Sequence, residues 1–496
     1  MYFCKEFYEF GNGIFNLVEP LFLVSTAILP PLSWCCQKKI YIISLMDNLY
    51  KIKKGLDLNL QGVAAQEVSV VAPSNVYALM PADFHGITPK MVVKEGEEVQ
   101  VGSALFVDKA TEQIKFCSPI SGKVKAVVRG ERRRILRVEV ESDGKMQRVQ
   151  LVKAGFQPAT REEALQLLLN SGLFAFFRQR PYDVVACPTD MPKAVFVSTF
   201  SKMPLAADFS FIVKGQEADF KSGIALLEKL AKVYVGISPE QINTPILPLD
   251  SAQVSVFSGP NPAGNVGVHI NRVSPVNKGE IVWTVGPEVV VMMGRLLRQG
   301  MVDFTRRIAV AGSEVENPAY LDTVIGAPLK DVLAGKLKKS TSNQRIINGN
   351  PLVGEKTDLE GYLSAMVTEV CVLPEGDDVN ELFGWAMPRL DQFSTNRSYF
   401  SWLLGSKKSY APDCRIKGGE RHMIMSGEYD RVFPMDIYAG YLVKAIITGD
   451  IDRQEQLGIY EVAPEDFAVA EFVDSSKLEL QRIVREGLDI LRKENA

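Results

Sequence analysis

The chain has few of the residues that hold metals in proteins. Its seven cysteines are irregularly spaced and form no C-x-x-C pair, and its three histidines (His85, His269 and His422) are far apart and form no H-E-x-x-H motif. Iron–sulfur clusters and structural zinc need clustered ligands, so we expect no metal site in this chain. The odd cysteine count favours reduced thiols over a disulfide framework.

Common catalytic and nucleotide-binding motifs are missing as well. The sequence contains no G-x-S-x-G elbow, no P-loop and no G-x-G-x-x-G after an expected strand, so it offers no catalytic residue of these classes. The 56 Lys and Arg residues against 59 Asp and Glu residues give a formal net charge of −3. A nucleic-acid surface normally needs a dense basic stripe, so we expect no nucleic acid as a partner.

The composition is that of an ordinary globular protein with several domains. The 496 residues, 46% of them hydrophobic and 23% charged, suffice for about three domains. Residues 1–45 stand apart, because the stretch between Glu19 and Lys38 is uncharged and apolar. Prolines interrupt it as a transmembrane helix, and the positive start of a secretory signal is missing. We expect residues 1–45 not to belong to the functional protein, with translation starting at Met46; an interfacial or signal segment is the alternative.

Residues 46–148 show short β-rich runs separated by turn signals. Two similar runs, at residues 93–102 and 118–124, resemble those of a lipoyl- or biotinyl-type barrel-sandwich domain. Lys109 stands off the midpoint between its flanking runs, so we expect it on the ascending strand as a structural residue. A lipoyl-carrying acyl-transfer component, with Lys109 at a hairpin tip, is the weaker alternative.

Residues 149–301 alternate helical and strand signals, which indicates a Rossmann-like α/β domain with a parallel sheet. Strands are expected at residues 193–199, 209–214 and 253–258, and helices at residues 161–171, 221–232 and 288–298. The glycine-rich stretch 258–271 follows the last of these strands, at the sheet edge where α/β folds bind ligands. Its candidate ligand-binding residues are Gly259, Asn261, Gly264, Gly267, His269 and Asn271. A rigid structural turn or an intersubunit contact is the alternative.

Residues 302–385 are expected to form a small β-grasp-like α+β module, and residues 386–496 a helical region. A capping box at Ser476 and Glu479 predicts the start of the last helix. The aromatic residues between Phe393 and Trp402, and the apolar helix at residues 437–447, are interpreted as core, with a docking face for partner subunits as the alternative.

Five segments in fixed order resemble one family, the NqrA subunits of the sodium-translocating NADH:quinone reductase. They are residues 51–58, 118–124, 258–271, 427–436 and 457–466. The resemblance implies the four modules above, including an SLBB-like β-grasp domain and an α/β domain similar to the flavoprotein subunit of complex I. It also implies a peripheral protein on the cytoplasmic side of the bacterial inner membrane, with five other subunits as partners.

The family's complex oxidises NADH, reduces ubiquinone or menaquinone and exports Na⁺. The resemblance implies that this chain carries no cofactor of its own, that flavins and the Fe–S cluster lie on partner subunits, and that it contributes to quinone binding and the semiquinone-to-quinol step. The chain would not be active alone. The alternative function is a redox-inactive docking scaffold of the same complex.

Overall fold

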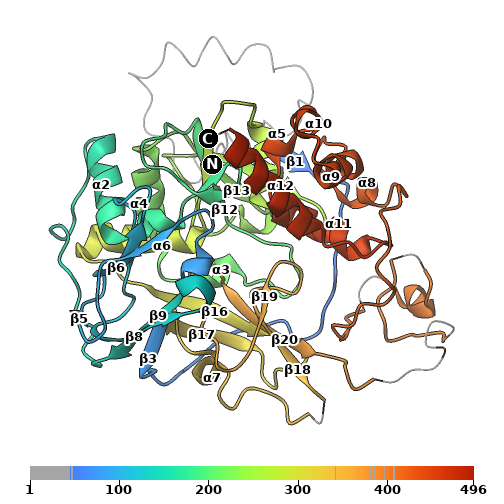
Figure 1. Cartoon of the computed structure of the whole chain (residues 1–496), viewed down its shortest axis with the longest axis horizontal. Helices are drawn as coiled ribbons and strands as arrows, with labels where there is room; N and C mark the ends of the chain where they lie inside the picture. Colours follow the sequence, from blue (N-terminus) through green and yellow to red (C-terminus); the bar gives the residue numbers. More distant parts are fainter. Residues whose placement is uncertain are drawn as a thin grey trace, which may run out of the picture. The chain divides into compact units, whose positions relative to one another are not determined.

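The structure is a computed structural model that describes residues 45, 48–340, 342–379, 383, 387–395, 397–405 and 408–495. Residues 49–496 form the unit considered below (Figure 1). The expectations for residues 1–45 and for a start at Met46 fall, apart from Leu45, outside the described residues.

Two small antiparallel sheets make up the first module. Phe106 and Phe116 stack between neighbouring strands with their ring centroids 4.7 Å apart, and the inward side chains of both sheets are buried. This layering follows from the alternation of apolar and polar residues along each strand. One sheet has the order β3 (Val76–Leu79), β9 (Ile135–Ser142), β8 (Gly122–Arg129) and β5 (Glu98–Val99); the other has the order β4 (Pro89–Met91), β6 (Ala104–Asp108) and β7 (Lys115–Cys117).

The second module is built on a seven-stranded sheet. Five of its strands run parallel, and two antiparallel strands close one edge. The order is β1 (Leu49–Lys51), β14 (Gln253–Ser258), β13 (Val233–Ile237), β12 (Ala194–Ser198), β15 (Val282–Thr284), β10 (Arg178–Arg180) and β11 (Val184–Val185). Its helices are α2 (Arg161–Ser171), α3 (Phe209–Ile212), α4 (Glu217–Glu228), α5 (Val266–Val273) and α6 (Pro287–Gln299).

Helix ends in this module follow the local signals. Thr160 caps α2 by accepting a hydrogen bond from the Glu163 backbone N–H, and Gly172 ends it in the left-handed conformation. Gly300 ends α6 in the same way, after a start at Pro287. The predicted helices at residues 161–171 and 288–298 are therefore confirmed, and α4 lies about four residues earlier than expected.

The strand expected at residues 209–214 is wrong, because this segment contains helix α3. Asp208 caps α3 by accepting a hydrogen bond from Ser210 N at 2.9 Å, and Phe209, Phe211 and Ile212 are buried. The sheet position belongs instead to β13, which the sequence pattern did not reveal. The strands expected at residues 193–199 and 253–258 are confirmed as β12 and β14.

The third module is a mixed six-stranded sheet, to which the N-terminal segment adds one edge strand. The parallel pairing of β2 with β17, and of β1 with β14 in the preceding sheet, ties residues 49–69 to two modules. The order is β19 (Glu355–Thr357), β18 (Gln344–Asn348), β20 (Glu369–Pro374), β16 (Thr305–Ala311), β17 (Ala319–Val324) and β2 (Ala65–Ser69), with the short helix α7 (Leu329–Val332).

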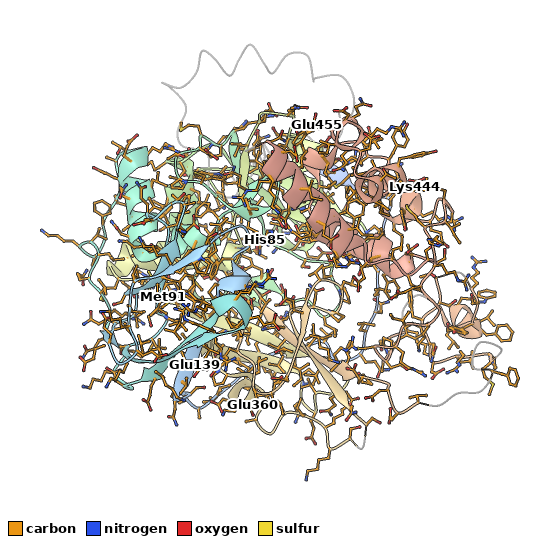
Figure 2. The ribbon with its side chains drawn as sticks, viewed as in Figure 1. His85, Met91, Glu139, Glu360, Lys444 and Glu455 are labelled. Atoms are coloured by element: carbon orange, nitrogen blue, oxygen red, sulfur yellow. The ribbon has the colours of Figure 1, made fainter. Side chains whose placement is uncertain are left out.

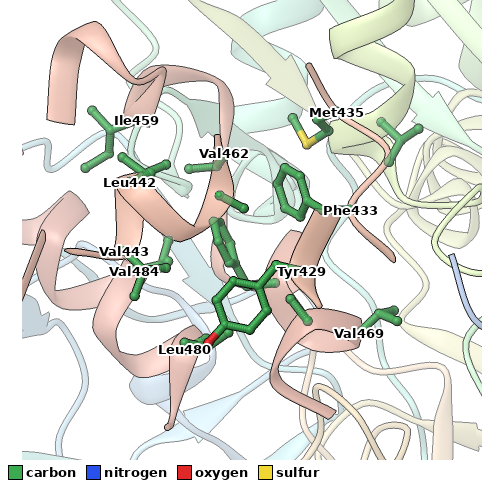
Figure 3. Packing of buried hydrophobic residues seen from close by; sticks show 14 of the residues in the cluster. Tyr429, Phe433, Met435, Leu442, Val443, Ile459, Val462, Val469, Leu480 and Val484 are labelled. Carbon is green, nitrogen blue, oxygen red and sulfur yellow. The ribbon is translucent and has the colours of Figure 1, made fainter. Parts of the chain in front are cut away.

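Short helices form the C-terminal part and share one hydrophobic core. Figure 3 shows side chains such as Tyr429, Phe433 and Leu480 packed together. The same core includes Phe257 and Val268 of the α/β module, so these helices cover the end of β14 and helix α5. They are α8 (Tyr429–Val432), α9 (Ala439–Thr448), α10 (Ile451–Gln456), α11 (Ala468–Val473) and α12 (Leu480–Glu494).

Two expectations for this part are corrected. The N-cap of α12 is Glu479, not Ser476, whose hydroxyl donates to the His422 carbonyl. The Glu471 carboxylate of α11 accepts from Gln481 N and so satisfies the first turn of α12. The apolar face of α9 is core as expected, but Phe400 and Trp402 are exposed rather than buried.

Candidate functional site

A cavity of about 770 Å³ lies at the carboxyl ends of β12 and β15, and all four modules contribute to its wall. This is the edge at which parallel α/β sheets bind ligands, and the volume suits a ligand the size of a cofactor. Its apolar wall includes Met80, Phe176, Met203, Val285 and Met366.

His85 comes to the cavity wall from the first module. Its Nε2 lies 2.9 Å from Asp489 Oδ1 of helix α12, and Figure 2 shows it between α12 and the strands of the first module. This contact links the start and the end of the chain at the cavity.

The first turns of two helices also reach the cavity. Gly286, Pro287 and Glu288 begin α6, while Gly264, Asn265 and Val266 lead into α5. The N-terminus of a helix carries a partial positive charge and attracts anions. In this cavity, carboxylates of the chain itself lie beside both first turns.

A buried ion-pair network forms one wall. The Arg180 guanidinium donates to Asp466 Oδ2 at 3.0 Å and to Glu465 Oε1 at 2.9 Å. Arg485 of α12 donates to Asp183 Oδ2 at 2.8 Å. Although burial opposes it, the neighbouring arginines lower the pKa of Asp183. The network joins the α/β module to the C-terminal helices.

Carboxyl groups with raised pKa values line the same cavity. Burial raises the pKa of Asp83 to about 6, against the hydrogen bond of 2.8 Å that it accepts from Ala365 N. Burial likewise raises the pKa of Glu465 to about 7, although Arg180 opposes the shift. A carboxyl group that titrates near neutral pH can donate a proton and take it up again.

Of the six predicted site residues, only Gly264 lines this cavity. Gly259 has φ +140°, and a Cβ there would lie 2.2 Å from the Ile52 carbonyl oxygen. The fully buried Asn261 accepts a hydrogen bond on its carbonyl from Leu56 N. Gly259 and Asn261 therefore serve the close packing of residues 52–57 against the end of β14.

Gly267, His269 and Asn271 lie in helix α5 rather than in a loop. His269 is buried, its Nε2 lies 2.9 Å from the Ala263 carbonyl oxygen, and its ring stacks on Phe257 with centroids 3.9 Å apart. Burial lowers its pKa to about 4. Asn271 donates to Glu461 Oε2 at 2.8 Å. These contacts are structural, and none of the three residues borders the cavity.

Lys109 follows the last residue of β6 and is exposed. It therefore opens the β6–β7 connection instead of lying on the ascending strand, and it is still not at the middle of that connection. Its backbone N–H donates to the Thr88 carbonyl at 2.7 Å, which holds its main chain against the neighbouring turn.

Sequence patterns did not point to Asp83, Arg180, Glu288 or Glu465. The Gly-Pro-Glu start of α6 directly after a strand could have indicated Glu288. Among the residues described, no group of three His, Cys, Asp or Glu side chains is placed to hold a metal ion. In the same part of the chain, no helix has the length and apolar character needed to cross a bilayer.

Three stretches match family models. They are described as the NqrA N-terminal barrel-sandwich hybrid domain (residues 50–143), the NqrA second alpha/beta domain (residues 159–302) and the NQRA C-terminal domain, of SLBB type (residues 307–358). The fold class expected from the sequence is thereby confirmed.

Curated relatives match along nearly the whole chain. Proteins named as the A-type subunit of Na(+)-translocating NADH-quinone reductase from Photorhabdus laumondii, Yersinia pestis and Serratia proteamaculans are each 36% identical, over 451, 459 and 455 residues. Each match covers 90% of this chain and 100% of the relative. A solved NAD⁺-reducing [NiFe]-hydrogenase chain aligns at 12% identity over 45% of this chain and 49% of its own, with a TM-score of 0.32, a likeness too weak to bear on function. The chain belongs to the NqrA family, the A-type subunits of the Na⁺-translocating NADH-quinone reductases.

Proposed function

We propose that this chain acts as the NqrA subunit of a Na⁺-translocating NADH:quinone reductase and works only within the assembled complex. The proposal is supported by the names of relatives that match over their full length. In that role it would lie on the cytoplasmic side of the bacterial inner membrane as a peripheral protein, with five other subunits as partners. Flavins and the Fe–S cluster would belong to those partners, and this chain would hold no cofactor of its own.

The cavity, rather than the predicted stretch 258–271 as a whole, would be the quinone site. The observation that carries this proposal is a volume of about 770 Å³ whose wall combines apolar side chains with the carboxyl groups of Asp83 and Glu465. A ubiquinone or menaquinone ring needs apolar surface for its faces and a few polar groups for its carbonyl oxygens. Gly264 is the one predicted residue that this site retains.

The chemistry of quinone reduction fits these carboxyl groups. Conversion of a quinone to its quinol takes up two electrons and two protons. The electrons would come from reduced cofactors on partner subunits. Asp83 and Glu465, whose burial raises their pKa values to about 6 and about 7, would deliver the protons to the two ring oxygens and recover them from solvent.

A cavity-filling variant tests the site. Val353 lines the cavity and is 37% exposed, whereas Val379 is 39% exposed and lies outside it. The purified full-length chain is titrated with decylubiquinone by saturation-transfer NMR. We expect saturable binding that Val353→Trp weakens at least about tenfold, because an indole would displace the ring, and that Val379→Trp leaves unchanged. Absence of saturable binding, or equal binding by both variants, would refute a quinone site in this cavity.

A redox-inactive docking scaffold of the same complex is the second candidate. It is favoured by the exposed apolar side chains of Phe400, Trp402, Leu403 and Leu404, which lie on one 3₁₀ turn. Exposed aromatic and aliphatic groups are typical of contacts with partner subunits. If the chain binds no decylubiquinone but the complex loses its partners on mutation of this turn, the scaffold function replaces the quinone site.

A further inference from the structure

All five basic side chains on the cavity wall are engaged by carboxylates of the chain. Arg180 has two such partners, and Asp183 serves two arginines at once. The pairs are Arg137 with Glu139 (2.7 Å), Arg178 with Asp183 (3.5 Å), Arg180 with Glu465 (2.9 Å), Lys356 with Glu375 (3.0 Å) and Arg485 with Asp183 (2.8 Å). A phosphate group entering the cavity would have to compete with these carboxylates for its cations.

The N-terminus of α6 is occupied in the same way. The Glu288 carboxylate folds back over the first turn and accepts a hydrogen bond from its own backbone N–H. It lies so close to Gly286 that a Cβ there would be 2.3 Å from Glu288 Oε1. This is the position at which a helix N-terminus holds the phosphate of a nucleotide. Glu288 therefore places a carboxylate of the chain itself where a ligand phosphate would bind.

Helix α5 shows the same arrangement at its own first turn. Asp466 Oδ2 is held by Arg180 and by the Ala463 backbone N–H at 2.9 Å. The buried Oδ1 has no hydrogen-bond partner and lies beside the first turn of α5, where a Cβ on Gly267 would be 2.4 Å away. The partial positive charge of the helix N-terminus stabilises a carboxylate in this position.

We propose that Glu288 and Asp466 act as built-in anions that restrict the cavity to uncharged ring ligands and exclude phosphate-bearing nucleotides, with Glu288 as the specificity-determining residue. The inference rests on the proposed function in taking the quinone as the ligand. It goes further by naming the residues that make the site reject the other common ligands of an α/β sheet. Both helix N-termini and the five cations are satisfied from within, so only a neutral molecule enters without displacing a charge.

Removal of the Glu288 charge provides the test. Full-length wild type, Glu288→Ala and Glu288→Gln are titrated by calorimetry at pH 8 with pyrophosphate and, separately, with decylubiquinone. We expect no saturable pyrophosphate binding by wild type, and at least about tenfold tighter binding by both variants, because the free helix N-terminus then accepts the anion. Decylubiquinone affinity should change by less than about threefold, since a neutral ring gains nothing from an anion site.

Glu217→Gln is the matched control, because Glu217 lies in the first turn of another helix, α4, outside the cavity. It should not gain pyrophosphate binding. Saturable pyrophosphate binding by wild type, or no gain in a folded Glu288 variant, would overturn the inference. If Glu288→Ala fails to fold, Glu288→Gln decides, since it keeps the size of the side chain. A gain of pyrophosphate binding without any decylubiquinone binding would instead sink the quinone proposal and leave the role of Glu288 standing.

Discussion

The guanidinium of Arg180 and the carboxylate of Asp466 form a buried ion pair, with Nη1 3.0 Å from Oδ2 and side chains only 2% and 1% exposed. The two residues are 286 positions apart and join β10 of the α/β module to the segment before α11. Removal of one partner from a buried pair leaves the other charge without compensation. The pair therefore makes attachment of the C-terminal helices depend on a single arginine.

We expect Arg180→Met to destabilise the protein by about 3–5 kcal/mol, because Asp466 and Glu465 lose their common partner. Urea unfolding of the full-length chain measures the effect. Arg482→Met is the control: this exposed arginine pairs with Glu479 and Glu486 on the surface of α12, and such pairs contribute about 0–1 kcal/mol. Equal effects of the two substitutions would show that the buried pair does not hold the C-terminal helices.

Asp83 gives the stability a pH dependence of predictable sign. Its pKa is about 6 in the folded protein and 3.8 ordinarily, because burial disfavours the charge. The folded state therefore binds this proton more tightly, and ionisation of Asp83 removes stability as the pH rises through about 6. Asp83→Asn lacks this loss, so its stability relative to wild type should increase by about 3 kcal/mol from pH 4 to pH 7, at about 1.4 kcal/mol per unit of pKa. Urea titrations across this range check it, and a stability difference independent of pH contradicts it.

His269 should be essential for packing and not for ligand binding. His269→Ala removes a ring that stacks on Phe257 and Phe200, at a cost of about 3 kcal/mol or more, while decylubiquinone affinity below the melting temperature stays unchanged. The exposed His422 is the control, and His422→Ala should alter neither property. In NMR titrations the His269 ring should stay neutral above pH 5, because burial lowers its pKa to about 4. Retained stability with lost quinone binding would show that His269 contacts the ligand after all.

Gly259 tests whether the glycine-rich stretch is structural. Gly259→Ala would place a Cβ 2.2 Å from the Ile52 carbonyl oxygen at φ +140°, and we expect a loss of more than about 2 kcal/mol. Gly215→Ala is a matched control with φ +85° and open space around the added Cβ, so it should cost only about 1 kcal/mol. Thermal melts of both variants compare the two costs. A Gly259→Ala protein as stable as the Gly215→Ala protein would refute the close approach.

Local signals predicted the elements whose ends carry their own chemistry. Helix α6 begins at Pro287 and ends at Gly300, and α2 is bounded by Thr160 and Gly172, so both could be read from the sequence. Helix α3 could not, because its four residues are too few to show a helical period and its Asp208 cap resembles any turn residue. The glycines before α5 likewise disguised a helix as a loop.

The candidate site was harder to predict than the fold. Asp83 and Glu465 reach the same cavity from segments more than 300 positions apart, and no periodicity or motif encodes that meeting. The stretch 258–271 was correctly connected with the carboxyl edge of the sheet, yet most of its polar residues point into packing contacts. Tertiary contacts therefore decided which side chains of that edge face the cavity.

Photoaffinity mapping tests the central claim most directly. The full-length chain is irradiated with a photoreactive ubiquinone, with and without excess decylubiquinone, and the labelled peptides are identified by mass spectrometry. We predict labelling that decylubiquinone suppresses in peptides containing residues 80–85, 284–289 or 362–367, all of which contribute to the cavity wall. Suppressible labelling confined to peptides away from the cavity, for example around Tyr438 and Tyr441 on α9, would contradict the account.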